Sequence, residues 1–75
     1  MAISERSTEE RLRERLRELR SGRGMSLAEV AALAGMGAST LSRLETGVRR
    51  IAVGHLGPLA AALGVSVEEL LAPPR

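Results

Sequence analysis

Residues 26–47 read SLAEVAALAGMGASTLSRLETG, and this stretch determines the fold that we expect. Ser26 stands three residues before Glu29, a spacing that lets the two side chains cap the start of a helix. Apolar residues then recur at helical spacing on both sides of a short glycine-containing segment. A tight turn between two helices needs a residue that tolerates positive φ, and Gly35 supplies it. The stretch therefore predicts two short helices joined by a tight turn.

The rest of the chain also follows helical spacing, with no convincing alternating run that would indicate a strand. Ser7 and Ser66 each stand three residues before a glutamate, as Ser26 does. Pro58 fits best in the first turn of a helix, so the fourth helix either starts near Gly57 or is longer and bends. We expect an all-α domain over residues 8–72, with helices over residues 8–21, 27–34, 38–46, about 57–63 and 67–72. Residues 1–7 would form an arm, and residues 73–75 a tail or the start of a linker.

Length and composition exclude several classes of protein. A chain of 75 residues is one small domain, too small for a large enclosed enzyme pocket. The sequence has no Cys, which excludes disulfides and thiolate zinc sites. It has no Phe, Trp or Tyr, which argues against modules that bind single strands by stacking bases on aromatic rings. No apolar run is long enough to span a membrane, and no signal peptide is visible.

The charges are distributed unevenly along the chain. All eleven basic residues are Arg and all nine acidic residues are Glu, giving a net charge of +2. Residues 1–25 carry seven Arg and five Glu, whereas residues 51–75 carry one Arg and two Glu. The molecule is therefore basic at one end and slightly acidic at the other. This balance is compatible with nucleic-acid binding, but a solvated charged helix explains it almost as well.

Two helices of about nine residues around a glycine turn have the spacing of a helix-turn-helix, although many helical hairpins share it. Residues 16–71 resemble the phage-repressor family of helix-turn-helix domains, which includes the lambda repressor, Cro and XRE types. The matching segments are Leu19-Arg20, Met25-Ser26, Glu29-Val30-Ala31, Gly35-Met36, residues 39–45, Gly47 and residues 59–71. The resemblance implies a five-helix domain that binds double-stranded DNA as a homodimer, with its third helix in the major groove.

The resemblance also implies roles for individual residues. Arg20 and Glu45 match the family's ion pair between the first helix and the end of the third. The predicted phosphate contacts come from the starts of the second and third helices and from the end of the third helix with its following loop. They are Ser26, Gly37, Thr46, Arg49 and Arg50. A plain N-cap remains the alternative for Ser26, and a solvated charge remains the alternative for Arg49 and Arg50.

The base-reading surface is expected on the third helix, at Ala38, Ser39, Ser42 and Arg43. Ala38 replaces the family's glutamine that bonds to adenine, and alanine offers only a methyl contact to thymine. Leu27 likewise replaces a polar residue that often touches phosphate. Arg43 is the only long donor on this surface, and it can contact a guanine edge with two hydrogen bonds. A phosphate contact or a salt bridge is the alternative role for Arg43.

We therefore expect a bacterial, sequence-specific DNA-binding transcription regulator of the repressor type, located in the cytoplasm and associated with the nucleoid when bound. No cofactor, metal site, membrane contact or catalytic arrangement is expected. One alternative is the DNA-binding head of a larger sensor, for example one with a cupin domain, where an effector would bind outside this domain. An antitoxin, and a protein-interaction module that uses the same scaffold, are further alternatives.

Overall fold

The computed structural model describes the backbone of residues 5–72 and the side chains of residues 8–72. All regular elements in this part of the chain are α-helices, as expected for an all-α domain. They are α1 (Glu5–Gly22), α2 (Leu27–Leu33), α3 (Ala38–Thr46), α4 (Val53–Leu63) and α5 (Val67–Leu71). The expected tail over residues 73–75 and the first four residues of the expected arm lie outside the described residues.

Two helix starts differ from the sequence prediction. Helix α1 begins at Glu5 rather than Thr8, so residues 5–7 belong to the helix and not to an arm, and Ser7 is no N-cap. Glutamate is a good helix former and is favoured in a first turn by the helix dipole. Helix α4 is the longer of the two predicted forms, because it begins at Val53 with Pro58 inside it. The Ala52 amide donates to Nδ1 of His55 at 2.9 Å, which caps this earlier start.

The hydrophobic core is one aliphatic cluster to which every helix contributes. Its members are Leu16, Val30, Ala31, Leu41, Leu44, Leu59, Ala60, Leu63 and Leu70. The leucine and valine side chains of this cluster are fully buried, so the cluster excludes water. Burying one such side chain contributes roughly 1.5–3 kcal/mol, which makes this cluster the main source of stability.

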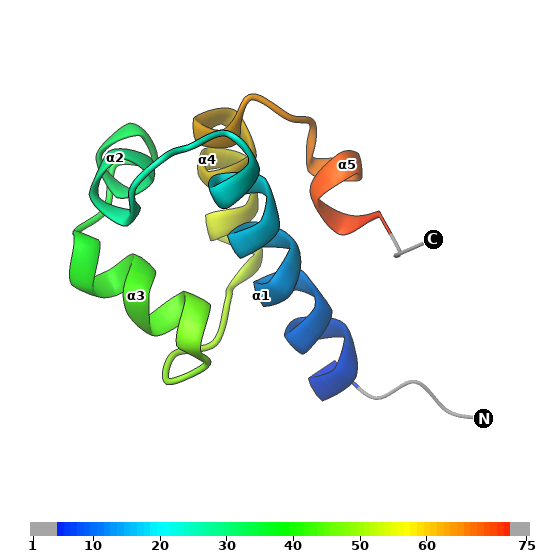
Figure 1. The fold of residues 1–75 in the computed structure, drawn as a ribbon. Coiled ribbons are helices and arrows are strands. Elements are labelled where there is room, and N and C mark those ends of the chain that lie inside the picture. The colour runs from blue at the N-terminus through cyan, green and yellow to red at the C-terminus, as the bar shows by residue number, and fades with distance from the viewer. Residues whose placement is uncertain (1–4, 73–75) are drawn as a thin grey trace.

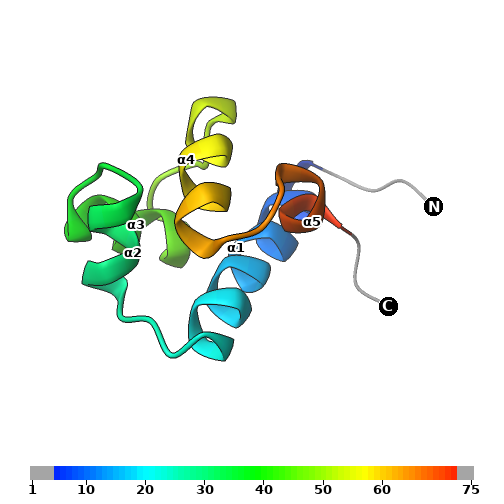
Figure 2. The same cartoon turned by 90° about the horizontal axis from the view of Figure 1, so that it is seen from above.

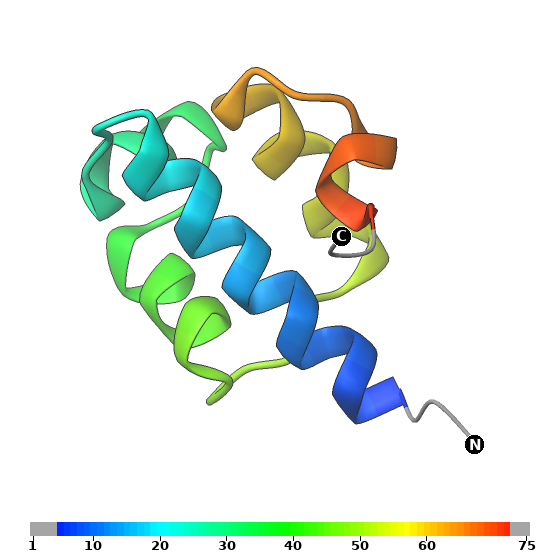
Figure 3. The ribbon, with the colours of Figure 1, turned by 45° about the vertical axis from the view of Figure 1, so that its right-hand side comes forward.

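Helix α1 crosses the molecule, with α2 and α3 on one side of it, α5 on the other and α4 behind it (Figure 1). It packs against α3 on one side and against α5 on the other, while α4 contacts α2 and α5. The view from above shows α2 and α3 together at one end of the molecule and α5 at the other end (Figure 2). Figure 3 shows α1 running diagonally in front of the other helices. The two helices of the predicted helix-turn-helix therefore lie away from α5.

The turn between α2 and α3 depends on Gly35. Its φ is 71°, its amide donates to the Ala32 carbonyl, and the next amide, of Met36, donates to the Ala31 carbonyl at 2.9 Å. This is the Schellman arrangement that satisfies the carbonyls at a helix C-terminus. The turn sets the direction in which α3 leaves α2, and thus the orientation of the helix-turn-helix.

None of the helices described here is both long and apolar enough to cross a membrane.

We predict that Gly35→Ala lowers the free energy of unfolding by about 1–2 kcal/mol, because an alanine at positive φ is strained. An added Cβ at Gly35 meets no atom within 4 Å, so backbone strain is the only expected effect. Gly22→Ala is the matched control: its Cβ also meets nothing, and Gly22 lies in α1 without positive φ. Urea denaturation should show a small gain of up to about 0.5 kcal/mol for the control. Equal effects at the two positions would contradict this account of the turn.

Candidate nucleic-acid interface

The outer surface of α3 carries the residues predicted to read bases. Ala38, Ser39 and Arg43 are exposed, and Ser42 is half-buried. The inward side of the same helix holds Leu41 and Leu44 in the core. The guanidinium of Arg43 has no hydrogen-bond or ion-pair partner among the side chains of residues 8–72. This helix therefore presents two hydroxyls, one methyl and one uncommitted long donor to solvent.

The structure brings Arg20 and Glu45 together in a bidentate ion pair. Nε of Arg20 lies 2.9 Å from Oε2 of Glu45, and Nη2 lies 3.0 Å from Oε1. The Glu45 side chain is 7% exposed and that of Arg20 is 23% exposed, so the carboxylate is buried. The hydrogen bond from Arg20 to this carboxylate raises the pKa of Arg20. Arg20 also donates to the Met25 carbonyl at 3.3 Å, so it connects α1, the segment before α2, and α3.

Two more arginines of α1 reach the C-terminal end of α3. Nη1 of Arg17 donates to the backbone carbonyl of Glu45 at 3.0 Å. The guanidinium of Arg13 lies against Gly47, where an added Cβ would be 3.1 Å from its Cζ. Positive charge at a helix C-terminus is favourable because the carbonyls there carry partial negative charge. The glycine at this position has φ 86° and leaves room for the Arg13 guanidinium.

The two predicted phosphate sites at helix starts differ in whether side chains already cap their backbone amides. At α2, Ser26 and Glu29 form a complete capping box, in which the Ser26 amide donates to Oε1 of Glu29 at 2.9 Å. This hydrogen bond lowers the pKa of Glu29, so the start of α2 carries a carboxylate at neutral pH. At α3, Gly37 is the N-cap and no side chain caps its first amides. The start of α3 is therefore the more open of the two toward an anion.

The loop after α3 holds the remaining predicted phosphate contacts. Thr46 donates from Oγ1 to the Arg43 carbonyl at 3.4 Å and is exposed. Arg49 is exposed, and its guanidinium has no partner within residues 8–72. Arg50 is 77% exposed, but its Nε donates to Oε1 of Glu9 at 3.4 Å. Within the described residues Arg50 is therefore engaged by a carboxylate, whereas its neighbour Arg49 is not.

Sequence reasoning missed several contacts that support α3. The Glu9–Arg13 ion pair at 3.0 Å has the i,i+4 spacing of a helix pair, but its extension to Arg50 spans 41 residues and carries no sequence signal. The contact of Arg17 with α3 was missed because nothing in its spacing separates it from the other arginines of α1. His55 is half-buried, and its Nδ1 accepts from the Ala52 amide at the start of α4. No group of three side chains able to hold a metal ion occurs among the residues the structure describes.

Known proteins share this sequence pattern. The pattern of the family described as helix-turn-helix matches residues 16–70. The HTH-type transcriptional regulator DdrOP3 of Deinococcus deserti is 41% identical over 61 residues, which are 81% of this chain and 47% of the relative. The chain thus spans about half the length of this curated relative.

Two solved structures are also similar. The clp gene regulator ClgR from C. glutamicum is 33% identical, with a TM-score of 0.78 over 85% of this chain and 83% of that one. The hypothetical transcription factor NHTF from Neisseria is 31% identical, with a TM-score of 0.84 over 99% of this chain and 85% of that one. Both likenesses support the five-helix fold described above.

We predict that Arg20→Leu lowers the free energy of unfolding by about 3 kcal/mol, because it leaves the buried Glu45 carboxylate without its partner. Glu45→Leu should cost less, because the Arg20 side chain is 23% exposed and its charge can reach water. The double variant should lose clearly less than the sum of the two, since it leaves no unpaired charge. Glu10→Leu, at an exposed position of α1, serves as the surface control and should change stability by less than about 0.5 kcal/mol. Additive losses in chemical denaturation would show that the two residues do not act as a pair.

Proposed function

This chain belongs to the helix-turn-helix family, and on that basis we propose that it is a transcription regulator that binds double-stranded DNA in a sequence-specific manner. The observation that carries the proposal is the outer surface of α3, which presents two hydroxyls and Arg43, an arginine without a partner among residues 8–72. The Arg20–Glu45 ion pair holds this helix against α1. A helix of this diameter fits the major groove, where base edges can be distinguished. The proposed mechanism is binding, without a catalytic step or a cofactor.

Base readout is assigned to the outer surface of α3. Arg43 would donate two hydrogen bonds to one guanine, and Ala38 would contact a thymine methyl group. Ser39 and Ser42 would add single hydrogen bonds to bases or phosphates. Because alanine replaces the family's glutamine, a large share of the discrimination would depend on Arg43. We therefore expect an operator in which one guanine per half-site is strongly preferred.

Phosphate contacts are assigned to the surroundings of α3. Gly37 would offer backbone amides at the start of α3, and Ser26, whose amide is bonded to Glu29, would offer its hydroxyl proton at the start of α2. Thr46, Arg49 and Arg50 would contact the backbone of the DNA beyond the other end of α3. Such contacts fix the register of the protein on the duplex but carry no sequence information themselves.

We further propose that the chain acts as a homodimer on a palindromic operator as a repressor, in the bacterial cytoplasm and at the nucleoid. Half-sites read by two copies of α3 would lie about one helical turn apart. The similarity to transcription regulators from several bacteria supports the bacterial regulator role.

Selection from a randomised duplex library, at low and at near-physiological salt, tests the function. An enriched palindrome with half-sites about one helical turn apart, and binding that survives the added salt, is the expected result. Binding that ignores sequence and disappears as salt rises would reflect attraction to phosphate alone and would contradict a sequence-specific regulator.

Variants of two arginines should separate base readout from phosphate contact. Arg43→Ala is expected to relax the preference at one base position, losing about 1–3 kcal/mol for the preferred sequence only. Arg49→Ala should weaken binding to all sequences about equally, and it should reduce the salt dependence by about one counterion. The measurement is a salt titration of affinity for the selected operator and for its guanine-substituted form. Uniform losses in both variants would refute the role assigned to Arg43.

A further inference from the structure

Helix α1 carries charged side chains on two faces, and the two faces differ in how they are satisfied. The residues that face α3 and its loop all have partners within the molecule: Glu9, Arg13, Arg17 and Arg20. On the face toward α5, the charged side chains of Arg11, Glu14 and Glu18 make no hydrogen bond or ion pair with any residue that the structure describes. Unpaired charges thus gather on the side of α1 that is turned away from α3.

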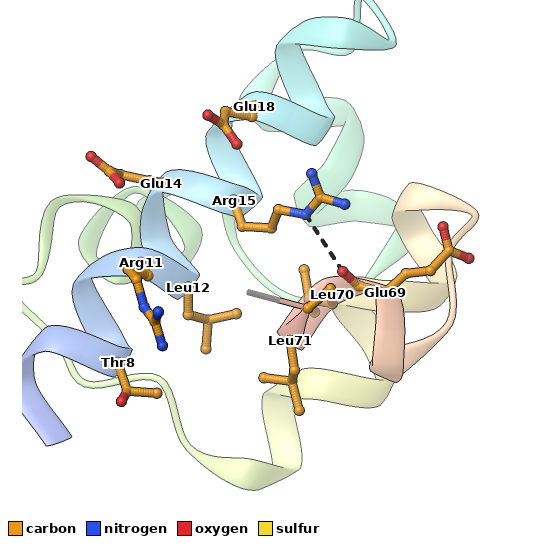
Figure 4. Close-up of a pocket in the computed structure, with 10 residues that line it drawn as sticks. Thr8, Arg11, Leu12, Glu14, Arg15, Glu18, Glu69, Leu70 and Leu71 are labelled. Atoms are coloured by element: carbon orange, nitrogen blue, oxygen red, sulfur yellow. Dashed lines mark hydrogen bonds between the residues drawn. The ribbon is translucent and has the colours of Figure 1, made fainter. Parts of the chain in front are cut away.

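These unpaired charges border an open groove between α1 and α5. The groove has a volume of about 600 Å³, and its apolar lining comes from Leu12, Leu70 and Leu71. Leu71 is 49% exposed there, although it is a large apolar side chain. Figure 4 shows Arg15 reaching across to α5, where its Nε lies 3.5 Å from the Glu69 carbonyl. An apolar strip bordered by charges is the usual make-up of a protein-binding surface.

The order of the charges along α1 does not suit pairing within the helix. Arg11, Glu14, Arg15 and Glu18 follow one another at i, i+3, i+4 and i+7, so they lie on one helical stripe. The i,i+4 neighbours on this stripe have the same sign, which is unfavourable within one helix. The i,i+3 neighbours have opposite signs, but arginine precedes glutamate, the less favourable order. The Glu9–Arg13 pair on the other face has the favourable order and does form.

The same order is self-complementary for two antiparallel copies of α1. A two-fold axis between residues 14 and 15 places Arg11 of one copy opposite Glu18 of the other, and Glu14 opposite Arg15. A two-fold axis makes each contact occur twice, as in most homodimers. We propose that a second copy of this chain docks on the groove between α1 and α5, with the two α1 helices antiparallel. The opposite side of α1 packs against α3 and takes no part in this contact.

Only the biological use of this contact rests on the proposed function, because the contact would be the surface through which the proposed DNA-binding dimer forms. Its physical content is independent of DNA. The charge pattern on α1 alone identifies the partner as a second copy of the chain. Dimer formation can therefore be tested on the protein without DNA.

Two single charge reversals at exposed positions test the pairing. We expect Arg11→Glu and Glu18→Arg each to raise the dimer dissociation constant by about tenfold or more, because like charges then face each other twice. An equimolar mixture of the two variants should form a heterodimer, since positions 11 and 18 of the two different chains then carry opposite charges wherever they meet. The double variant R11E/E18R keeps the net charge of the original chain and should dimerise as the original does. Sedimentation velocity over a concentration series measures all four.

The controls separate this surface from general charge effects and from the DNA proposal. Glu68→Arg makes the same charge change on an exposed residue outside the groove lining and should leave the dissociation constant unchanged. An original chain that stays monomeric, or variants that neither weaken alone nor pair when mixed, would overturn the proposal. Binding to a duplex with a single half-site should be the same for all variants. Absence of that binding in the original chain would refute the DNA function and leave the docking result standing.

Discussion

The bidentate pair between Arg20 and Glu45 is the interaction on which the candidate interface depends. A carboxylate that is 7% exposed lies on α3, and the guanidinium that neutralises it comes from α1, 25 residues earlier in the chain. Two charges are stable at this depth only when both are present with good geometry. The orientation of α3 is therefore coupled to that of α1. Arg20 also bonds the Met25 carbonyl, so the entry to α2 is held by the same group.

Local rules explain why most of the fold could be predicted from the sequence. Helix ends at Gly35, Gly47 and Gly64 follow from the need for a left-handed residue, and the Ser26 and Ser66 capping boxes fix two helix starts. Where a start has no such signal, as at Ala52, the sequence left two possibilities, and the His55 cap selects the longer helix. Helix α1 begins three residues before the predicted start, because its first turn carries two competing signals, a glutamate at position 5 and a potential serine cap at position 7.

The candidate site was less accessible to sequence reasoning than the fold. A family resemblance could assign Arg20 and Glu45, but the contacts of Arg17 and Glu9 with the α3 end depend on how α1 crosses α3. Crossing angles are set by packing of the whole core and are not encoded in any short spacing. The different states of Arg49 and Arg50, adjacent residues of one type, arise in the same way. The guanidinium of Arg49 has no partner within residues 8–72, and that of Arg50 donates to a glutamate 41 residues away.

The single aliphatic cluster determines how the protein unfolds, and through unfolding how much of it is degraded in a cell. Each helix contributes between one and three residues to the core, so no pair of helices keeps a core of its own when another leaves. Unfolding of such a domain is cooperative, so α3, the helix proposed to face DNA, cannot persist in a partly folded chain. In a cell, proteases and chaperones act on the unfolded fraction, which rises several-fold for a loss of about 1–2 kcal/mol. The amount of competent protein is thereby linked to the packing of leucines that lie outside the proposed DNA interface.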